Sequence, residues 1–288
     1  MESIAFATCR DVPALTSDDR LAADVLAGRG VEVTPVIWDA PAIDWPRFAA
    51  VVIRSTWDYH LAPARYGAWL RDRASDGSNV WNPVSAVLAN THKGYLSAFE
   101  RRGVPIVPTT VLSAAPGQSL RGVLEDAKYD DVVIKPAVSA NARGTWRASL
   151  ASSGDHQAAF QEQAAREDVL VQPYLPEVAA AGEWSLVFFG GNYSHAVLKQ
   201  PASGEFRVQE NFGGGSIAAE PPAHIIEQAH AVLALADAPL LYARVDGIDR
   251  GGRFLLMELE INEPTLFLGL ADGGAARFAD AIQGVLHV

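Results

Sequence analysis

Apolar runs and amphipathic stretches alternate along the first part of the chain, as they do when helices connect the strands of a sheet. The apolar runs 3–9, 31–38 and 49–56 predict three strands. A helix capped by Thr16 or Ser17 and ended by Gly30 follows the first strand, and a second helix is expected at 63–74. This order indicates a small parallel sheet with helices on its faces.

The pattern changes after a boundary near residues 79–90. A helix at 96–103 and a connecting strand at 104–113 lead into the next unit. Residues 119–175 follow the order helix, strand, loop, strand, helix, strand, which predicts a compact α+β lobe.

Strands come in pairs in the last part of the chain. The segments 182–189 and 193–200 are joined by Gly190, Gly191 and Asn192, which is a strong hairpin signal. The remaining predicted elements are a helix at 222–237, a strand pair at 240–246 and 253–262, and a closing helix at 274–288.

These elements predict a fold of mixed α/β and α+β class in three lobes. The N-terminal lobe is a parallel α/β unit, the middle lobe is a small α+β lid, and the C-terminal lobe is built on an antiparallel sheet. The expected limits are 1–88 for the first lobe, 89–112 for a linker with a helix that packs on the C-terminal lobe, 113–175 for the lid and 176–288 for the C-terminal lobe.

Composition and charge exclude several classes of protein. The 288 residues are 49% hydrophobic and 20% charged, which is enough apolar content for a large core. No apolar run is long enough to span a membrane, and the N-terminus lacks a signal sequence, so we expect a soluble, cytoplasmic protein. Cys9 is the only cysteine, which excludes an internal disulfide and a cysteine metal cluster.

The net charge of -11 argues against general affinity for nucleic acid or for anionic membranes. The expected partner is a small molecule, and a homo-oligomer stays open. Any polyanionic ligand must then be bound by local cations.

Lysine is rare among those cations. Of the 23 lysines and arginines only four are lysines, and three of them, Lys93, Lys135 and Lys199, stand at the ends of expected elements. Lysine presents a compact charge that suits phosphate. The alternative is that they are ordinary solvated residues.

Acidic residues form a row on the last expected strand. Side chains of a strand alternate between its faces, so Glu258, Glu260 and Asn262 point to one side. The preceding strand carries a similar row of Tyr242, Arg244 and Asp246.

The length of the turn between the two strands decides whether the rows share a face. An odd loop, such as three residues centred on Gly251, places Arg244 opposite Glu258 with Asp246 beside them, whereas an even loop separates the rows. We expect the odd loop, and therefore Asp246, Glu258 and Glu260 to converge next to Arg244.

Converging carboxylates repel each other and are costly to bury. A divalent cation removes both problems, and oxygen ligands without nearby His or Cys favour Mg²⁺ or Mn²⁺. Two readings without metal stay open: a solvent-facing acidic strand, and a simple salt bridge between Arg244 and Glu258.

The ordered motifs resemble the ATP-grasp superfamily, which includes D-alanine–D-alanine ligase, glutathione synthetase and the RimK-like ligases. They are VVIKP, VLVQPYL, GEWS, RVD and the acid-rich strand that ends in EP. With WNP, KGYL, SHAVLK, FR and MELEINEP, the chain is most similar to the branch that contains the O-ureidoserine cyclo-ligase of cycloserine biosynthesis. The resemblance covers about Asn82 to Leu268, and RSTWDY at 54–59 extends it weakly.

The resemblance implies an ATP site. Lys93 and Lys135 match the lysines that hold the phosphates, and Glu183 matches the acid that binds the ribose, unless it is a solvent-exposed residue at a hairpin. Gln172, Pro173, Tyr174 and Leu175 match the link between the two ATP-binding lobes. In this link the Pro173 carbonyl and the Leu175 amide would bind the edge of the adenine.

The resemblance also implies roles at the reacting end. Lys199 and Arg207 match cations near the terminal phosphate, and Arg244 matches the arginine that steadies an acyl phosphate. The metal ligands, for two ions, correspond to Asp246, Glu258 and Glu260, with Asn262 either a further ligand or a substrate contact.

Two glycine-related features depart from the family pattern. The loop 137–145 has a single glycine where relatives have a glycine-rich loop, so Ser139, Asn141 and Arg143 are expected to clamp the phosphates with side chains. The cluster at 211–216 supplies flexible amides near the transferred phosphate or is a plain surface loop.

The implied activity is that of an ATP-dependent carboxylate–amine ligase acting through an acyl phosphate on a small amino-acid-like substrate, with ring closure as one form of the reaction. Residues expected to face the phosphates or the substrate are Arg54, Ser55, Thr56, Trp57, Asp58 and Glu263. Trp57 is equally well read as a packing residue. Phosphoryl transfer to another acceptor and a nucleotide-binding regulator without turnover are the alternatives.

Overall fold

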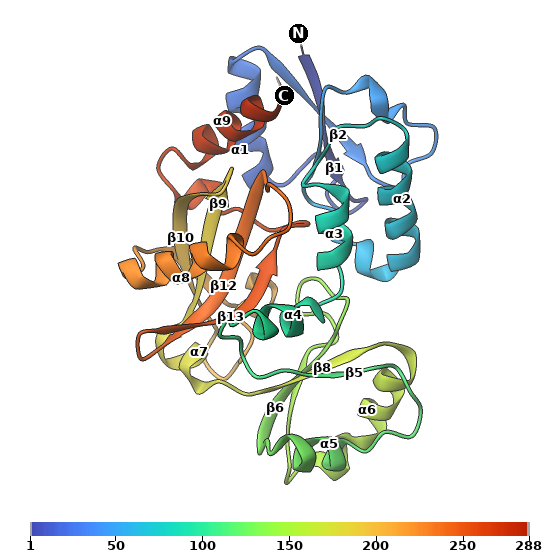
Figure 1. Ribbon diagram of the computed structural model, residues 1–288, viewed down its shortest axis with the longest axis vertical. Helices are drawn as coiled ribbons and strands as arrows, with labels where there is room; N and C mark the ends of the chain where they lie inside the picture. The colour runs from blue at the N-terminus through green and yellow to red at the C-terminus, as the bar shows by residue number, and fades with distance from the viewer. Residues whose placement is uncertain (1, 287–288) are drawn as a thin grey trace.

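The computed structural model describes residues 2–286 and contains three sheets that follow one another along its long axis (Figure 1). The first sheet is parallel, as expected, with the order β2-β1-β3-β4. Its strands are β1 (Glu2–Thr8), β2 (Val31–Ile37), β3 (Val51–Ile53) and β4 (Val80–Trp81), and its helices are α1 (Ser17–Gly28), α2 (Pro63–Ser75) and α3 (Val84–Asn90). Of the two proposed caps of α1, Thr16 is the one used, because its hydroxyl accepts from the Asp19 amide at 3.0 Å.

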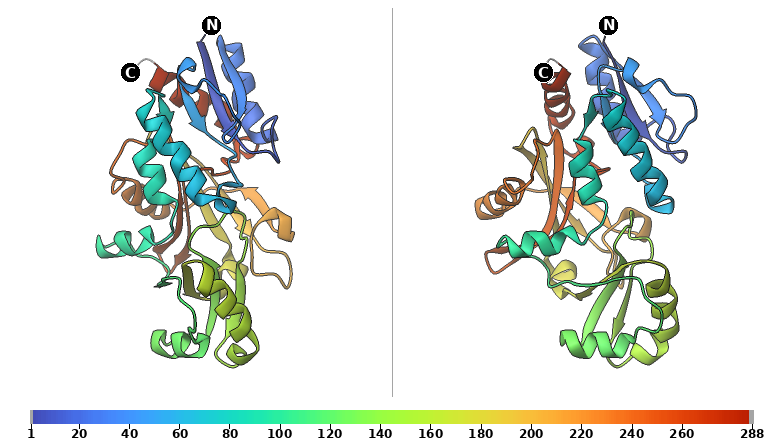
Figure 2. Two further views of the ribbon diagram at one scale, coloured as in Figure 1. Left: turned by 90° about the vertical axis from the view of Figure 1, so that its right-hand side faces the viewer. Right: turned by 45° about the vertical axis from the view of Figure 1, so that its right-hand side comes forward.

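The lid is an antiparallel sheet with the order β5-β8-β6-β7. It contains β5 (Thr110–Leu112), α5 (Leu120–Ala127), β6 (Asp131–Pro136), β7 (Trp146–Ser149), α6 (Ser153–Arg166) and β8 (Val169–Pro173). Leu124, Ile134, Phe160 and Val171 belong to an apolar core that the lid forms for itself. Figure 2 shows this lobe at the end of the molecule opposite both termini.

The C-terminal sheet is antiparallel with the order β11-β10-β9-β12-β13. Its strands are β9 (Glu183–Phe189), β10 (Asn192–Gln200), β11 (Gly215–Ala218), β12 (Tyr242–Arg250) and β13 (Arg253–Glu260). The helices near it are α4 (Tyr95–Arg101), α7 (Pro176–Ala181), α8 (Ala223–Leu233) and α9 (Gly274–Leu286). Residues 287 and 288, the end of the predicted closing helix, lie outside the described residues.

Helix α9 returns to the N-terminal lobe and packs against α1 (Figure 1). Phe278 of α9 stacks on Phe189 of the C-terminal sheet at 5.0 Å between ring centres and contacts Phe6 of the first sheet at 6.5 Å. The first and last lobes therefore share one buried core, whereas the lid has its own. The lobe limits expected from the sequence stay a prediction.

The two C-terminal hairpins have different outcomes. The predicted turn between β9 and β10 is confirmed, and its Gly190 and Gly191 have φ of 54° and 79°, which glycine adopts at little cost. The expected odd loop between β12 and β13 is wrong: Arg250 pairs with Arg253, so the turn holds the two residues Gly251 and Gly252.

A β-bulge reverses the effect of this even turn. The register shifts between Asp246 and Gly247, because Gly247 pairs with Leu256 while Asp246 pairs with Glu258, which leaves Met257 as the extra residue. One inserted residue changes the parity of every pair beyond it. The acidic row therefore reaches the same face as Asp246 after all.

Some structure falls where the sequence pattern predicted none. The boundary segment 79–90 contains β4 and α3, and the glycine cluster at 211–216 runs into the edge strand β11, where Ser216 pairs with Lys199. Within residues 2–286 no helix is long and apolar enough to cross a membrane.

Candidate active site

A cavity of about 510 Å³ lies between the lid and the C-terminal sheet. One part of its lining is apolar and consists of Val107, Val133, Leu175, Val178, Val208 and Met257. Another part is ionisable and consists of Lys93, Lys135, Glu183, Lys199, Arg207, Glu210, Arg244, Asp246, Glu258, Glu260 and Glu263. Such a cavity suits a ligand that has a flat apolar group at one end and anionic groups at the other.

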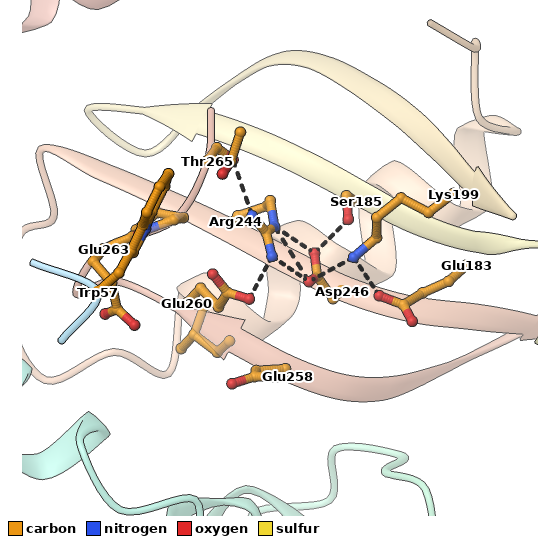
Figure 3. A network of polar contacts seen from close by, with 12 residues as sticks. Trp57, Glu183, Ser185, Lys199, Arg244, Asp246, Glu258, Glu260, Glu263 and Thr265 are labelled. Atoms are coloured by element: carbon orange, nitrogen blue, oxygen red, sulfur yellow. Dashed lines mark hydrogen bonds and ion pairs between the residues drawn. The ribbon is translucent and has the colours of Figure 1, made fainter. Parts of the chain in front are cut away.

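The charged floor is built by β12 and β13 (Figure 3). Arg244 lies opposite Glu260 and Asp246 lies opposite Glu258. The expected pairing of Arg244 with Glu258 is therefore wrong by two residues, one from the turn and one from the bulge. The Arg244 guanidinium donates to Asp246 at 2.8 Å and also to Glu260, while Lys93 Nζ lies 2.9 Å from Glu258. The structure thus brings Asp246, Glu258 and Glu260 together beside Arg244.

Lys199 extends this floor from β10. Its Nζ lies 2.5 Å from a Glu183 oxygen and 3.1 Å from Asp246 Oδ2, and Ser185 donates to Asp246 Oδ1 at 2.6 Å. Asp246 is therefore held by two cations and one hydroxyl. Glu183, expected to bind a ribose, is paired with a lysine in this arrangement.

Ion pairing determines the charge state of the floor. Burial raises the pKa of a carboxyl group, but Arg244 and Lys199 hold the pKa of Asp246 well below its usual range. Burial is likewise outweighed at Glu258, whose pKa is lowered by Lys93. In turn, Glu258 raises the pKa of Lys93 against the effect of burial. These groups are therefore charged at neutral pH.

Two other carboxyl groups behave differently. Burial raises the pKa of Glu260 to about 7, although Arg244 opposes the shift. Burial, reinforced by the negative charge of Glu260, raises the pKa of Glu263 to about 8. A cation brought in by a ligand would stabilise the charged form of both carboxyl groups.

The two expected phosphate lysines reach the cavity from different elements. Lys93 precedes α4, and its Nζ also donates to the Ser139 carbonyl at 2.8 Å. Lys135 lies on β6 in the lid, and among residues 2–286 no ion pair holds its Nζ. Burial lowers the pKa of Lys135. The cavity thus offers a cation that an anionic ligand can pair.

The link from the lid to the C-terminal lobe lines the apolar part of the cavity. Gln172, Pro173, Tyr174 and Leu175 all contribute to the lining, and Gln172 donates to the Thr109 hydroxyl at 2.8 Å. The sequence interpretation missed the apolar residues from elsewhere in the chain, Val107, Val133, Val178, Val208 and Met257. The alternation along β6, which places Val133 on the same face as Lys135, was a usable signal for one of them.

The glycine-poor loop 137–145 contributes only some of its expected residues to the cavity lining. Ser139 and Asn141 line the cavity, as do Ala140, Ala142 and Thr145, which were not expected. Arg143 does not line it. Arg207 does, and it lies over the Phe212 ring at 3.5 Å and pairs with Glu205 at 2.8 Å.

Most of the expected first-lobe residues point elsewhere. Trp57 lines the cavity, but four residues do not, namely Arg54, Ser55, Thr56 and Asp58. Arg54 and Ser55 bind the Asp19 carboxylate, Thr56 contacts Tyr66, and Asp58 accepts from Trp38. Arg54 also donates to the Pro264 carbonyl at 2.8 Å. These side chains therefore bind protein groups outside the cavity lining, and the expectation that they face the phosphates finds no support in this geometry.

Asn262 is also turned away from the acidic row. Its Oδ1 accepts a hydrogen bond from the Tyr66 hydroxyl at 2.5 Å, and it is not part of the cavity lining. Strand β13 ends at Glu260, so the alternation that placed Asn262 with the acids stops before it. Glu263, expected at the substrate, does line the cavity.

The donor chemistry of the floor fits Mg²⁺. Asp246, Glu258 and Glu260 offer only hard oxygen donors on one wall. Among the described residues, however, no three carboxylate or imidazole groups are already gathered for a metal, since Lys93, Lys199 and Arg244 hold these carboxylates. The residues fit the ion once these pairs open.

Comparison with known proteins identifies relatives over nearly the whole chain. Residues 4–82 match the family model for the N-terminal domain of D-cycloserine synthetase DcsG. The cycloserine biosynthesis protein DcsG of Streptomyces lavendulae is 32% identical over 277 residues, which cover 89% of this chain and 90% of that protein. A glutathione synthetase of Ralstonia nicotianae is 24% identical over 282 residues, covering 90% of this chain and 82% of that protein.

Solved structures give the same result. The crystal structure of D-cycloserine synthetase DcsG matches with a TM-score of 0.87 at 28% identity and covers 99% of both chains. A D-alanine–D-alanine ligase of Bacillus anthracis matches with a TM-score of 0.72 at 13% identity, covering 100% of this chain and 97% of that one, which shows a common fold.

The predicted ATP-grasp fold and the resemblance to its cycloserine branch are thereby confirmed. The chain belongs to the DcsG family of ATP-grasp enzymes and is an ATP-dependent ligase that forms carbon–nitrogen bonds.

Proposed function

We propose that this enzyme activates the carboxylate of a small amino-acid-like substrate as an acyl phosphate, and that a nitrogen of the same molecule then attacks to close a ring. The observation that carries the proposal is the cavity, whose lining joins apolar residues to four cations, Lys93, Lys135, Lys199 and Arg244. The similarity to a D-cycloserine synthetase supports ring closure.

The nucleotide would lie along the cavity from the lid link to the floor. The adenine fits the apolar slot next to Gln172 and Leu175, and Glu183 is near enough to the floor to receive the ribose hydroxyls once Lys199 moves to a phosphate. Lys93 and Lys135 then hold the phosphates from opposite sides. Ser139 and Asn141 are the loop residues in position to contact them.

Chemistry takes place at the floor. The terminal phosphoryl group passes to the substrate carboxylate, with Lys199 and Arg207 beside the phosphate and Arg244 beside the acyl oxygen that gains charge. Asp246, Glu258 and Glu260 would hold two Mg²⁺ ions, which neutralise the phosphate charge when bound. The nitrogen attacks the acyl carbon, the bond from that carbon to the phosphate oxygen breaks, and the nitrogen loses a proton to solvent.

ADP formation across a panel tests the substrate class. The panel contains ATP, Mg²⁺ and amino acids with their ureido and hydroxylamine derivatives, O-ureidoserine among them. Hydroxylamine in the assay traps an acyl phosphate as a hydroxamate. We expect ADP and hydroxamate together for at least one amino-acid derivative.

ADP formation without hydroxamate would instead favour phosphoryl transfer to a different acceptor. Absence of ADP with every compound would favour a nucleotide-binding regulator. Asp246→Asn serves as the inactive control, because it removes the carboxylate that Arg244, Lys199 and Ser185 share.

A further inference from the structure

The segment that follows β13 is held by its backbone carbonyls. Six consecutive carbonyl oxygens, from Ile261 to Leu266, each accept a hydrogen bond from a different side chain. In order, the donors are Asn82 at 2.7 Å, Tyr242 at 2.8 Å, Trp57 at 3.0 Å, Arg54 at 2.8 Å, Arg244 at 3.0 Å and His195 at 2.8 Å. These donors come from both the first lobe and the C-terminal sheet, so the segment is fixed between them.

This anchoring determines which side chains enter the cavity. Asn262, Pro264 and Leu266 are buried, whereas the alternate residues Glu263 and Thr265 are half-buried and line the cavity. Trp57 lies next to Glu263 and donates its indole N–H to the Glu263 carbonyl (Figure 3). The position of Glu263 is thus set by hydrogen bonds to its backbone.

Charge pairing sets Glu263 apart from the rest of the lining. Glu183 and Asp246 pair with Lys199, Glu258 pairs with Lys93, and Glu260 pairs with Arg244. Within residues 2–286 the Glu263 carboxylate has no ion pair and no side-chain hydrogen bond, although it is half-buried. The remaining lining carboxylate, Glu210, is exposed to solvent.

The position of this acid fits a substrate group rather than the nucleotide. In Figure 3 Glu183 and Glu263 lie at opposite ends of the polar network, with Arg244 and Asp246 between them. Phosphates approach the end that holds Lys199. An amino acid whose carboxylate lies at Arg244 would therefore carry its ammonium group toward Glu263. The Glu263 side chain, which has no ion pair among residues 2–286, can bind that group.

We propose that Glu263 is a specificity-determining residue whose carboxylate binds the ammonium group of an amino-acid substrate, and that Trp57 and Arg54 are positioning residues that hold its backbone. This assignment rests on the proposed function. It predicts that the enzyme distinguishes an amino acid from the corresponding acid without the amino group.

The test compares such a pair of compounds, O-ureidoserine and its des-amino counterpart 3-(ureidooxy)propanoate, or the panel compound with the highest kcat/KM and its des-amino counterpart. The wild type should prefer the amino acid by about 10- to 100-fold in kcat/KM, the contribution expected from a hydrogen bond to a charged group. In Glu263→Gln this preference should fall below about 3-fold, with KM for ATP unchanged.

Two further variants separate recognition from general damage. Trp57→Phe keeps an aromatic side chain but removes the donor to the Glu263 carbonyl, so KM for the amino acid should rise about 5-fold while kcat and KM for ATP are kept. Glu162→Gln, on the exposed face of α6, is the matched control and should behave as the wild type.

An unchanged preference for the amino acid in Glu263→Gln, or an equal loss for both compounds, would overturn the assignment while leaving the proposed function intact. If the wild type forms ADP with no amino acid of the panel, the proposed function fails and the assignment fails with it.

Discussion

At the scale of single residues, Arg244 joins the charged floor to the segment that follows β13, from Ile261 to Leu266. Its guanidinium contacts Asp246 and Glu260, donates to the Thr265 carbonyl at 3.0 Å and lies over the Phe267 ring at 5.5 Å. A flat guanidinium with several donors can keep these contacts together, which a lysine ammonium cannot do. Arg244 therefore orients the Asp246 and Glu260 carboxylates and the segment that carries Glu263.

Lys135 should give ATP binding a characteristic pH dependence. Because burial lowers its pKa, it loses its charge at a lower pH than an exposed lysine does. The charged form is complete below this pKa and is lost as the pH rises through it. KM for ATP should therefore increase by about 10-fold for each pH unit above the Lys135 pKa.

Steady-state kinetics from pH 7 to 10 measure this effect. Lys135→Arg keeps its charge and should move the increase to higher pH, whereas Lys128→Arg on the surface should leave it in place. An increase that is identical in all three proteins would show that Lys135 does not bind the phosphates.

Short sequence motifs predicted several cavity residues correctly. They failed for residues whose position depends on a partner far away in the sequence. Lys93, Lys135 and Lys199 stood out because lysine is rare, and all three line the cavity. Arg54 also belonged to a suggestive motif, but Asp19, 35 residues earlier, binds it inside the first lobe. No local pattern reports such a pairing.

At the scale of elements, the β-bulge at Met257 determines whether the acidic row reaches the cavity. The turn at Gly251 and Gly252 alone would send Glu258 and Glu260 to the opposite face from Asp246. The strand pattern predicted the rows correctly as far as Glu260, where β13 ends, but it could not report the bulge, because a bulge depends on the pairing with the neighbouring strand. Asp246, Glu258 and Glu260 share one face, as expected, although the loop proposed for it was wrong.

Gly247 is the glycine that this irregular pairing requires. A Cβ there would lie 2.4 Å from the Leu255 carbonyl oxygen and 2.5 Å from the Phe254 ring. Gly247→Ala should therefore destabilise the enzyme by about 2 kcal/mol or more and displace Asp246. Urea unfolding followed by tryptophan fluorescence measures the loss.

Gly154→Ala is the control for that substitution. A Cβ at Gly154, on α6, meets no atom within 4 Å, so alanine there should leave stability unchanged or raise it slightly. Equal stability of the two variants would show that the strands at the bulge are not closely packed.

At the scale of the whole molecule, the first and last lobes behave as one body and the lid as another. Helix α9 and the shared core join the first and last lobes, and Asn82 connects them with four hydrogen bonds. The lid has a separate core, and the linker residues His92 and Lys93 bind it through Asp168, the Ala137 carbonyl and the Ser139 carbonyl. We expect it to be the lobe that closes over the nucleotide and excludes water.

Asn82→Asp tests the connection between the lobes. The side-chain amide donates to the Tyr242 and Ile261 carbonyls, and a carboxylate in its place would face both oxygens with no proton to give. We expect a loss of about 3 kcal/mol and faster amide exchange in β1, β3 and β12, with exchange in the lid unchanged. Asn192→Asp, at the exposed start of β10, is the control and should change neither the stability nor the amide exchange. Faster exchange throughout the lid in Asn82→Asp would contradict the division into two bodies.

The acyl phosphate is the central claim, and isotope transfer tests it most directly. The substrate is labelled with ¹⁸O in its carboxylate and converted with unlabelled ATP, and the released phosphate is examined by mass spectrometry. Since the phosphoryl group leaves with one carboxylate oxygen, the account predicts phosphate that carries one ¹⁸O atom. Unlabelled phosphate during full turnover would contradict it.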